Sequence, residues 1–79
     1  MPVGLIKRSF SLAGHRTSVA LESAFWDALE TSAHSRGITL ARLVATVDAA
    51  RDGATALASS LRLYALREAR ENAKKIADT

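Results

Sequence analysis

The chain has 79 residues, no cysteine and a formal net charge of +3. This length allows one small domain, and small domains bury only about 60% of the surface that their unfolded chains expose. The lack of cysteine excludes disulfides and cysteine-rich metal sites as sources of extra stability, which leaves the association of copies. No apolar run approaches the roughly 20 residues of a membrane span, and residues 1–10 lack the hydrophobic block of a secretory leader. We therefore expect a cytoplasmic protein that does not associate with membranes.

Charge is distributed unevenly along the chain. Residues 1–20 hold Lys7, Arg8 and Arg16 and no acid, whereas residues 21–37 hold three acids and a single arginine. This pattern suits an N-terminal segment that faces a polyanion while the following helix faces away. The alternative interpretation is a solvated tail that carries a few charges.

Residues 5–21 have the composition and alternation of β-strand. In the second half of this segment, two sets of side chains alternate: Thr17, Val19 and Leu21 on one side, and Arg16, Ser18 and Ala20 on the other. Gly14 interrupts the pattern. It marks either the turn of a hairpin or a bulge in one long strand, and the sequence leaves both open.

Three helices are predicted after the strand. The first covers about residues 22–36, with Glu22 or Ser23 as its N-cap and Gly37 ending it. Its apolar stripe consists of Phe25, Trp26, Leu29 and Ala33. Adjacent aromatic residues at the start of such a helix favour a core role over base stacking.

The second predicted helix starts after Thr39, its natural N-cap, and stops before Asp52 and Gly53. Its apolar residues, at spacings i, i+3, i+4 and i+7, are Leu40, Leu43, Val44 and Val47. A further helix is expected over about residues 55–76, whose final stretch mixes charges of both signs.

A single strand with two short helices would leave unpaired backbone on both strand edges. The sequence therefore predicts that a second copy supplies the partner strand, which gives a two-stranded antiparallel ribbon. Such a ribbon fits the DNA major groove, where its outward side chains reach base edges.

Several stretches also resemble a known family. They are residues 8–11, 13–19, 25–29 and 36–40, which include the sequences GHRTS and FWDAL. The chain is similar to a bacterial ribbon-helix-helix family marked by these two motifs. The resemblance implies a ribbon-helix-helix fold and an obligate intertwined dimer. With the further helix predicted above, we expect a mostly α fold with an additional C-terminal helix. The chain would then divide into residues 1–14 as an arm or extra strand, 15–53 as the core and 54–79 as the C-terminal helix.

The resemblance also implies a function, because the wider class consists largely of bacterial transcriptional repressors and antitoxins. Proteins of this particular type often carry a sulfotransferase label, which no residue of this chain supports. We expect a dimeric, sequence-specific DNA-binding regulator. The residues expected to contact bases are Arg16, Ser18 and Ala20. The residues expected to contact phosphates are Lys7, Arg8, His15, Thr39 and Arg42. The residues expected in the dimer core are Val19, Leu21, Phe25, Leu29, Leu43 and Val47.

The expected base contacts differ in strength. Arg16 can pair with guanine through two hydrogen bonds, Ser18 can serve either base type, and Ala20 can only touch a thymine methyl group. Ala20 stands where the class usually has a polar or basic residue. The start of the helix after Thr39 offers free amides to a phosphate, and Arg42 follows within one turn.

No catalytic, metal or cofactor site is expected. His15 and His34 lie on different segments, without carboxylates or cysteines at ligand spacing. The four glycines are isolated and form no phosphate-binding loop. The chain is therefore not expected to be an enzyme.

A second functional class is a protein-interaction module. In that interpretation the core merely dimerises, while the C-terminal helix binds a partner or builds a higher oligomer through Leu57, Leu61 and Tyr64. An antitoxin would combine both functions. The ribbon distinguishes the two classes: exposed Arg16 and Ser18 favour DNA, whereas their coverage would favour the interaction module.

Overall fold

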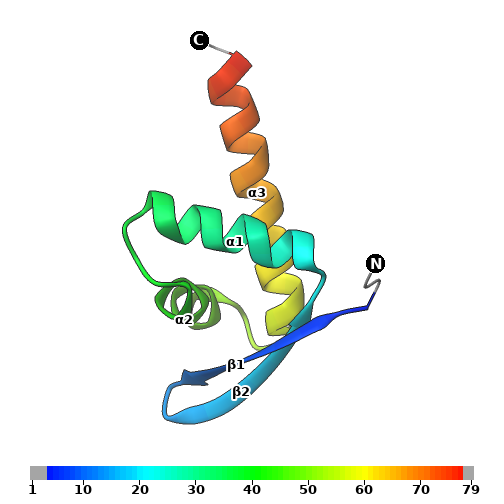
Figure 1. Cartoon of the computed structure of the whole chain (residues 1–79). Coiled ribbons are helices and arrows are strands. Elements are labelled where there is room, and N and C mark those ends of the chain that lie inside the picture. The colour runs from blue at the N-terminus through cyan, green and yellow to red at the C-terminus, as the bar shows by residue number, and fades with distance from the viewer. Residues whose placement is uncertain (1–3, 78–79) are drawn as a thin grey trace.

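The computed structural model describes residues 4–77 and shows a β-hairpin followed by three helices (Figure 1). The elements are β1 (Ile6–Leu12), β2 (His15–Leu21), α1 (Ser23–Ser35), α2 (Leu40–Ala50) and α3 (Leu57–Ala77). The predicted mostly α architecture, with a ribbon, two helices and an additional C-terminal helix, is confirmed. No helix within the described residues is long and apolar enough to cross a membrane.

The two strands pair antiparallel within the chain, from Ile6 opposite Leu21 to Leu12 opposite His15. Ala13 and Gly14 form the turn with φ of 50° and 82°. Two consecutive residues with positive φ are typical of a type I′ turn, whose twist suits a hairpin. Of the two alternatives for Gly14, the hairpin is therefore the correct one. The expectation that a second copy must supply the partner strand is wrong, because β1 of the same chain pairs with β2.

One face of the hairpin forms the floor of the hydrophobic core. The residues that it buries are Phe10, Leu12, Val19 and Leu21. The helices cover this face with their own buried side chains, among them Trp26, Leu29, Leu43, Val44 and Leu61. Each large apolar side chain so buried contributes about 1.5–3 kcal/mol. The core role predicted for the aromatic pair is confirmed for Trp26, which is 1% exposed and whose Nε1 donates to the carbonyl oxygen of Ile6 at 2.8 Å.

The predicted helix boundaries agree closely with the structure. Glu22 is the N-cap residue of α1, although its side chain makes no capping hydrogen bond. Gly37 follows the C-cap of α1 with φ of 69°, the left-handed conformation that glycine adopts without strain. Thr39 caps α2, since its hydroxyl accepts a hydrogen bond from the Arg42 amide at 3.1 Å.

A polar cluster fastens α3 to α1. The Ser32 hydroxyl donates to Glu68 at 2.8 Å, and the Tyr64 hydroxyl, 3.0 Å from that of Ser32, donates to it in turn. Arg36 reaches both carboxylate oxygens of Glu68 at 3.0 Å. The hydrogen bond from Ser32, followed by the contact with Arg36, lowers the pKa of Glu68.

Replacing Glu68 with glutamine is expected to lower the free energy of unfolding at neutral pH by about 1 kcal/mol, the net value of one such hydrogen bond. Because the folded pKa of Glu68 is lowered, its ionised form stabilises the fold above the unfolded pKa. That contribution disappears as the pH falls through the folded pKa. Urea unfolding of Glu68→Gln between pH 3 and 7 should therefore show a weaker loss of stability toward acid. The same substitution at exposed Glu71 is the control, and an identical profile for both variants would contradict the role of Glu68.

Candidate nucleic-acid interface

The outer face of the hairpin is polar and faces away from the helices. Alternation along each strand places six side chains there, namely Lys7, Ser9 and Ser11 from β1 and Arg16, Ser18 and Ala20 from β2. All are exposed except Ala20, which is half-buried. We call these six residues the ribbon face. The predicted split of β2 into a core side and an outer side is confirmed.

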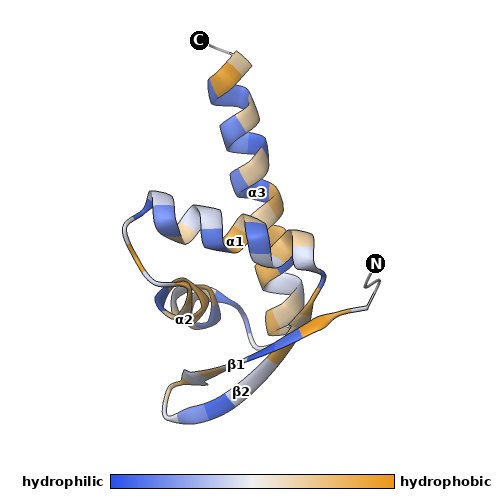
Figure 2. Cartoon of the chain, viewed as in Figure 1, coloured by the Kyte–Doolittle hydropathy of each residue, from blue (hydrophilic) through white to orange (hydrophobic). Residues whose placement is uncertain are grey.

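Cross-strand pairing organises the ribbon face into three rows. Ser11 stands opposite Arg16, Ser9 opposite Ser18, and Lys7 opposite Ala20. The hydroxyls of Ser9 and Ser18 lie 3.1 Å apart, within hydrogen-bond distance. Each row therefore combines a hydrogen-bonding or cationic group with a neighbour small enough to leave it accessible. Figure 2 shows the hydrophilic colouring of β2 next to the turn.

Within residues 4–77, no acidic side chain pairs with the cations of the ribbon face. Four other arginines form ion pairs with acids: Arg8, Arg36, Arg51 and Arg62. Among the described residues, neither Lys7 nor Arg16 has such a partner. The ribbon face thus presents unpaired positive charge, which suits a polyanion.

The start of α2 provides a second polar element. The Thr39 hydroxyl accepts a hydrogen bond from the amide of Arg42, and the Thr39 carbonyl oxygen accepts one from the amide of Leu43. The amides of Leu40 and Ala41 come before the first bond inside the helix, so they remain available to an anion. The exposed side chain of Arg42 has no ion-pair partner among residues 4–77.

Two of the expected phosphate-contacting residues lie away from the ribbon face. Arg8 alternates to the opposite side, where its guanidinium stacks 5.1 Å from the Trp26 ring and pairs with Glu30 at 2.8 Å. His15 is exposed beside the turn, on the side of Thr17. The structure therefore brings Arg16, Ser18 and Ala20 together with Lys7, but neither Arg8 nor His15 with them.

The residues expected in the dimer core lie within the core of the single chain. Four of them are at most 4% exposed: Val19, Leu21, Leu29 and Leu43. Phe25 and Val47 are half-buried and pack against that core. Leu57, Leu61 and Tyr64, which were proposed for partner binding, also pack within the chain. Leu57 and Leu61 are buried, so the expectation that these two bind a partner is wrong. Tyr64 is half-buried and within hydrogen-bond distance of Ser32, which leaves only part of its surface accessible.

Sequence reasoning missed Ser9 and Ser11. The available signal was the alternation of Lys7, Ser9 and Ser11 with Phe10 and Leu12, which matches that of β2. Only the hairpin register shows that both sets lie on one face. Within the described residues, no group of three or more histidine, aspartate or glutamate side chains is placed to hold a metal ion.

Comparison with known proteins gives one match. A family model described as the ribbon-helix-helix domain matches residues 5–69, which includes the hairpin, α1, α2 and the first part of α3. The comparisons with curated proteins and with solved structures give no match.

Proposed function

Because the chain belongs to the ribbon-helix-helix family, whose members are typically DNA-binding transcription regulators or antitoxins, we propose that it is a sequence-specific DNA-binding regulator. The observation that carries this proposal is the ribbon face, an exposed strip of serines and unpaired cations on a two-stranded antiparallel ribbon. Such a ribbon has the width to enter the major groove. Domains of this family are generally non-enzymatic, so we assign no reaction to the chain.

In this proposal the ribbon face contacts the DNA bases, and cations at its edge and at the start of α2 contact the DNA phosphates. Arg16 donates two hydrogen bonds to guanine, while Ser9, Ser11 and Ser18 supply hydroxyls that serve any base. Lys7 contacts a phosphate at the edge of the groove. A second phosphate is bound by the free amides after Thr39, with Arg42 beside them.

We further propose that two copies act together in the cytoplasm, since the family usually binds DNA as a dimer. The exposed area of the chain also supports association. It is 5642 Å², whereas a compact monomer of 8.4 kDa exposes about 4,600 Å². The excess exposed area is similar in size to the roughly 800 Å² that each partner buries in a standard interface.

Major-groove reading is tested with a duplex of the protein's own promoter in which 7-deazaguanine replaces guanine. This base lacks the N7 acceptor in the major groove but keeps its pairing edge and the phosphates. We expect fluorescence anisotropy to show affinity falling about 5- to 100-fold, toward that of a scrambled duplex. Equal affinity for the natural and the deaza duplex would contradict groove reading by Arg16.

A further inference from the structure

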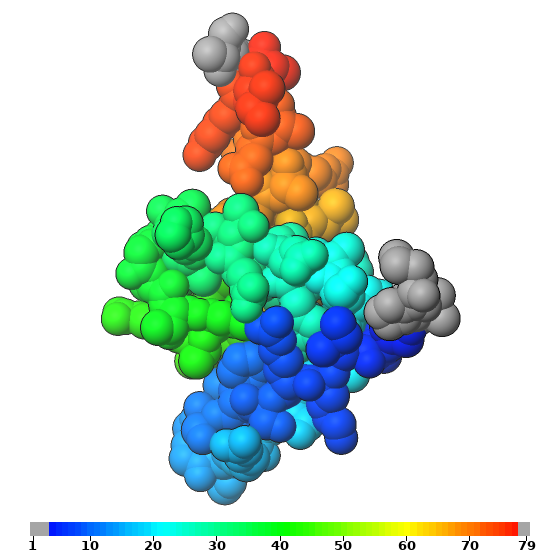
Figure 3. All heavy atoms as spheres, in the orientation of Figure 1, coloured from blue at the N-terminus to red at the C-terminus, as the bar shows by residue number. Residues whose placement is uncertain are grey.

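Beyond its contact through Glu68, the second half of α3 lies outside the core. Leu57, Leu61 and Ala65 are buried, but residues 66–77 are exposed apart from half-buried Glu68. These residues form about three turns, roughly 18 Å of helix. Figures 1 and 3 show this half of α3 projecting from one end of the molecule, with the hairpin at the other end. The ribbon face and the projecting helix are therefore separate surfaces.

A row of side chains follows one side of α3. Leu63, Arg67, Arg70 and Lys74 succeed one another at spacings of four, three and four residues, which brings them onto one helical face. Leu63 is 49% exposed, although it is a large apolar residue. Within the described part of the chain, the three cations have no acidic partner. We call these four residues the α3 row.

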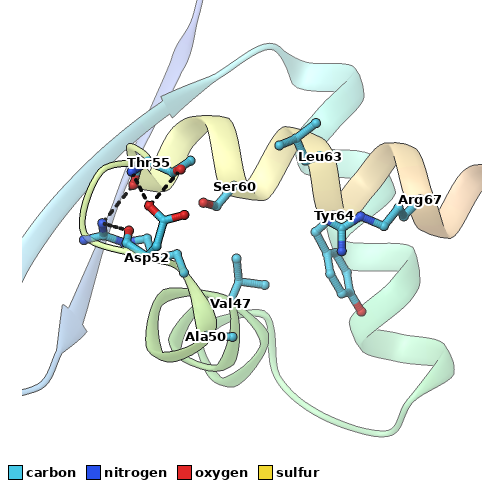
Figure 4. A pocket seen from close by; sticks show the side chains of 9 residues that line it. Val47, Ala50, Asp52, Thr55, Ser60, Leu63, Tyr64 and Arg67 are labelled. Carbon is cyan, nitrogen blue, oxygen red and sulfur yellow. Dashed lines mark hydrogen bonds between the residues drawn. The ribbon is translucent and has the colours of Figure 1, made fainter.

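The lower end of the α3 row borders a groove between α2 and α3 of about 310 Å³. Val47 and Ala50 from α2 face Leu63 and Tyr64 from α3, and Arg67 closes the groove on the α3 side (Figure 4). The groove also has a polar end, lined by Arg51, Asp52, Thr55 and Ser60. It therefore combines an apolar part between Val47 and Leu63 with a cation at the edge that borders the exposed helix.

The acidic residue of the groove does not neutralise Arg67. The Asp52 carboxylate accepts hydrogen bonds from the amides of Ala54 and Thr55, both at 2.9 Å, and from the Thr55 hydroxyl. These bonds, first that of Ala54, lower the pKa of Asp52. The Asp52 carboxylate is therefore used in hydrogen bonds within the loop between α2 and α3. Arg67 remains available to pair with an acidic group of another molecule.

We propose that the groove and the α3 row dock an acidic amphipathic segment of another protein. One apolar side chain of that segment enters the groove against Val47 and Leu63. Acidic side chains on the following turns pair with Arg67, Arg70 and Lys74. A second copy of this chain fits less well, because symmetric pairing would set one row of cations against another. The inference is independent of DNA binding, since the ribbon face lies at the other end of the molecule.

The test uses the full chain and two fluorescein-labelled helical peptides of about 14 residues, long enough to cover the groove and the α3 row. One peptide carries leucine on one face and glutamate beside it, and the other has lysine in place of every glutamate. At 0.15 M salt we expect the acidic peptide to bind at least about threefold more tightly, the factor that three exposed pairs at the low end of 0.2–1 kcal/mol each would give. Equal binding of both peptides, or no binding of the acidic one, would overturn the proposal.

Variants locate the binding surface. Arg70→Glu is expected to weaken binding of the acidic peptide about three- to tenfold and to leave DNA affinity within about twofold. Arg42→Glu makes the same change of net charge on α2, and should weaken DNA binding while sparing the peptide. Loss of DNA affinity in Arg70→Glu equal to that in Arg42→Glu would assign the α3 row to DNA instead. Self-association of the unliganded chain that Leu63→Asp abolishes would assign the surface to a second copy.

Discussion

Replacing Leu21 with aspartate is expected to unfold the chain. Leu21 is 0% exposed, at the end of β2, inside the core that the hairpin shares with the helices. The substitution removes about 2–3 kcal/mol of apolar burial and places a carboxylate among apolar groups, which costs several kcal/mol more. A domain of this size has a total stability of only about 5–10 kcal/mol.

Circular dichroism during thermal unfolding measures this effect directly. The Leu21→Asp variant should show no cooperative transition at temperatures where the natural chain is folded. Ser18→Asp is the matched control, because it adds the same group to β2 on the exposed ribbon face and should melt cooperatively. A cooperative transition of Leu21→Asp near that of the natural chain would contradict the described core.

Replacing Arg16 with alanine is expected to leave the chain folded but to remove most of its preference for its own promoter. Arg16 is exposed, has no ion-pair partner among the described residues, and carries the only guanidinium of the ribbon face. A two-bond contact with guanine contributes about 1–3 kcal/mol of discrimination, which corresponds to roughly a 5- to 150-fold change in relative affinity. Affinity for a scrambled duplex should fall less, because only one phosphate-proximal charge is lost.

Anisotropy with promoter and scrambled duplexes at one salt concentration gives the two affinities. Arg70→Ala is the control, since it removes an exposed arginine from the opposite end of the molecule. Survival of the natural preference in Arg16→Ala would exclude Arg16 from base recognition, even if total affinity decreased.

Local sequence patterns predicted much of the fold. Gly37 and Thr39 fixed the boundary between α1 and α2, because a left-handed glycine and a capping hydroxyl act through neighbouring backbone alone. The alternation of β2 also predicted which side chains face outward. The helical pattern after residue 55 predicted the extra C-terminal helix, and the family likeness added the ribbon-helix-helix fold; the structure confirms both.

The pairing of the strands could not be predicted in the same way. A glycine that interrupts an alternating segment is compatible with a turn or with a bulge, and the choice depends on contacts between distant residues. Here the core supplies those contacts, since Phe10 and Leu12 of β1 join Val19 and Leu21 of β2 beneath the helices. A strand from a second copy is required only if β2 has no neighbour in its own chain, and β1 is that neighbour.

The roles of individual residues on α3 were still harder to predict from the sequence. Leu57, Leu61 and Tyr64 follow a helical period, which shows that they share a face but not what covers it. That face packs into the chain's own core, while Leu63 and Leu66, on other sides of α3, remain about half exposed. Arg8 illustrates the same problem, because its contacts with Trp26 and Glu30 depend on tertiary structure.

The most direct test of the account is the binding of the natural chain to its own promoter and to a scrambled duplex across a salt series. We expect tighter binding to the promoter than to the scrambled duplex, and an affinity for both duplexes that falls steeply as the salt concentration rises. With Lys7, Arg16 and Arg42 on each of two copies, the six cations should give a logarithmic slope of about −5.4. Absence of binding to either duplex at low salt would contradict DNA recognition by the ribbon face and leave the projecting half of α3 as the functional surface.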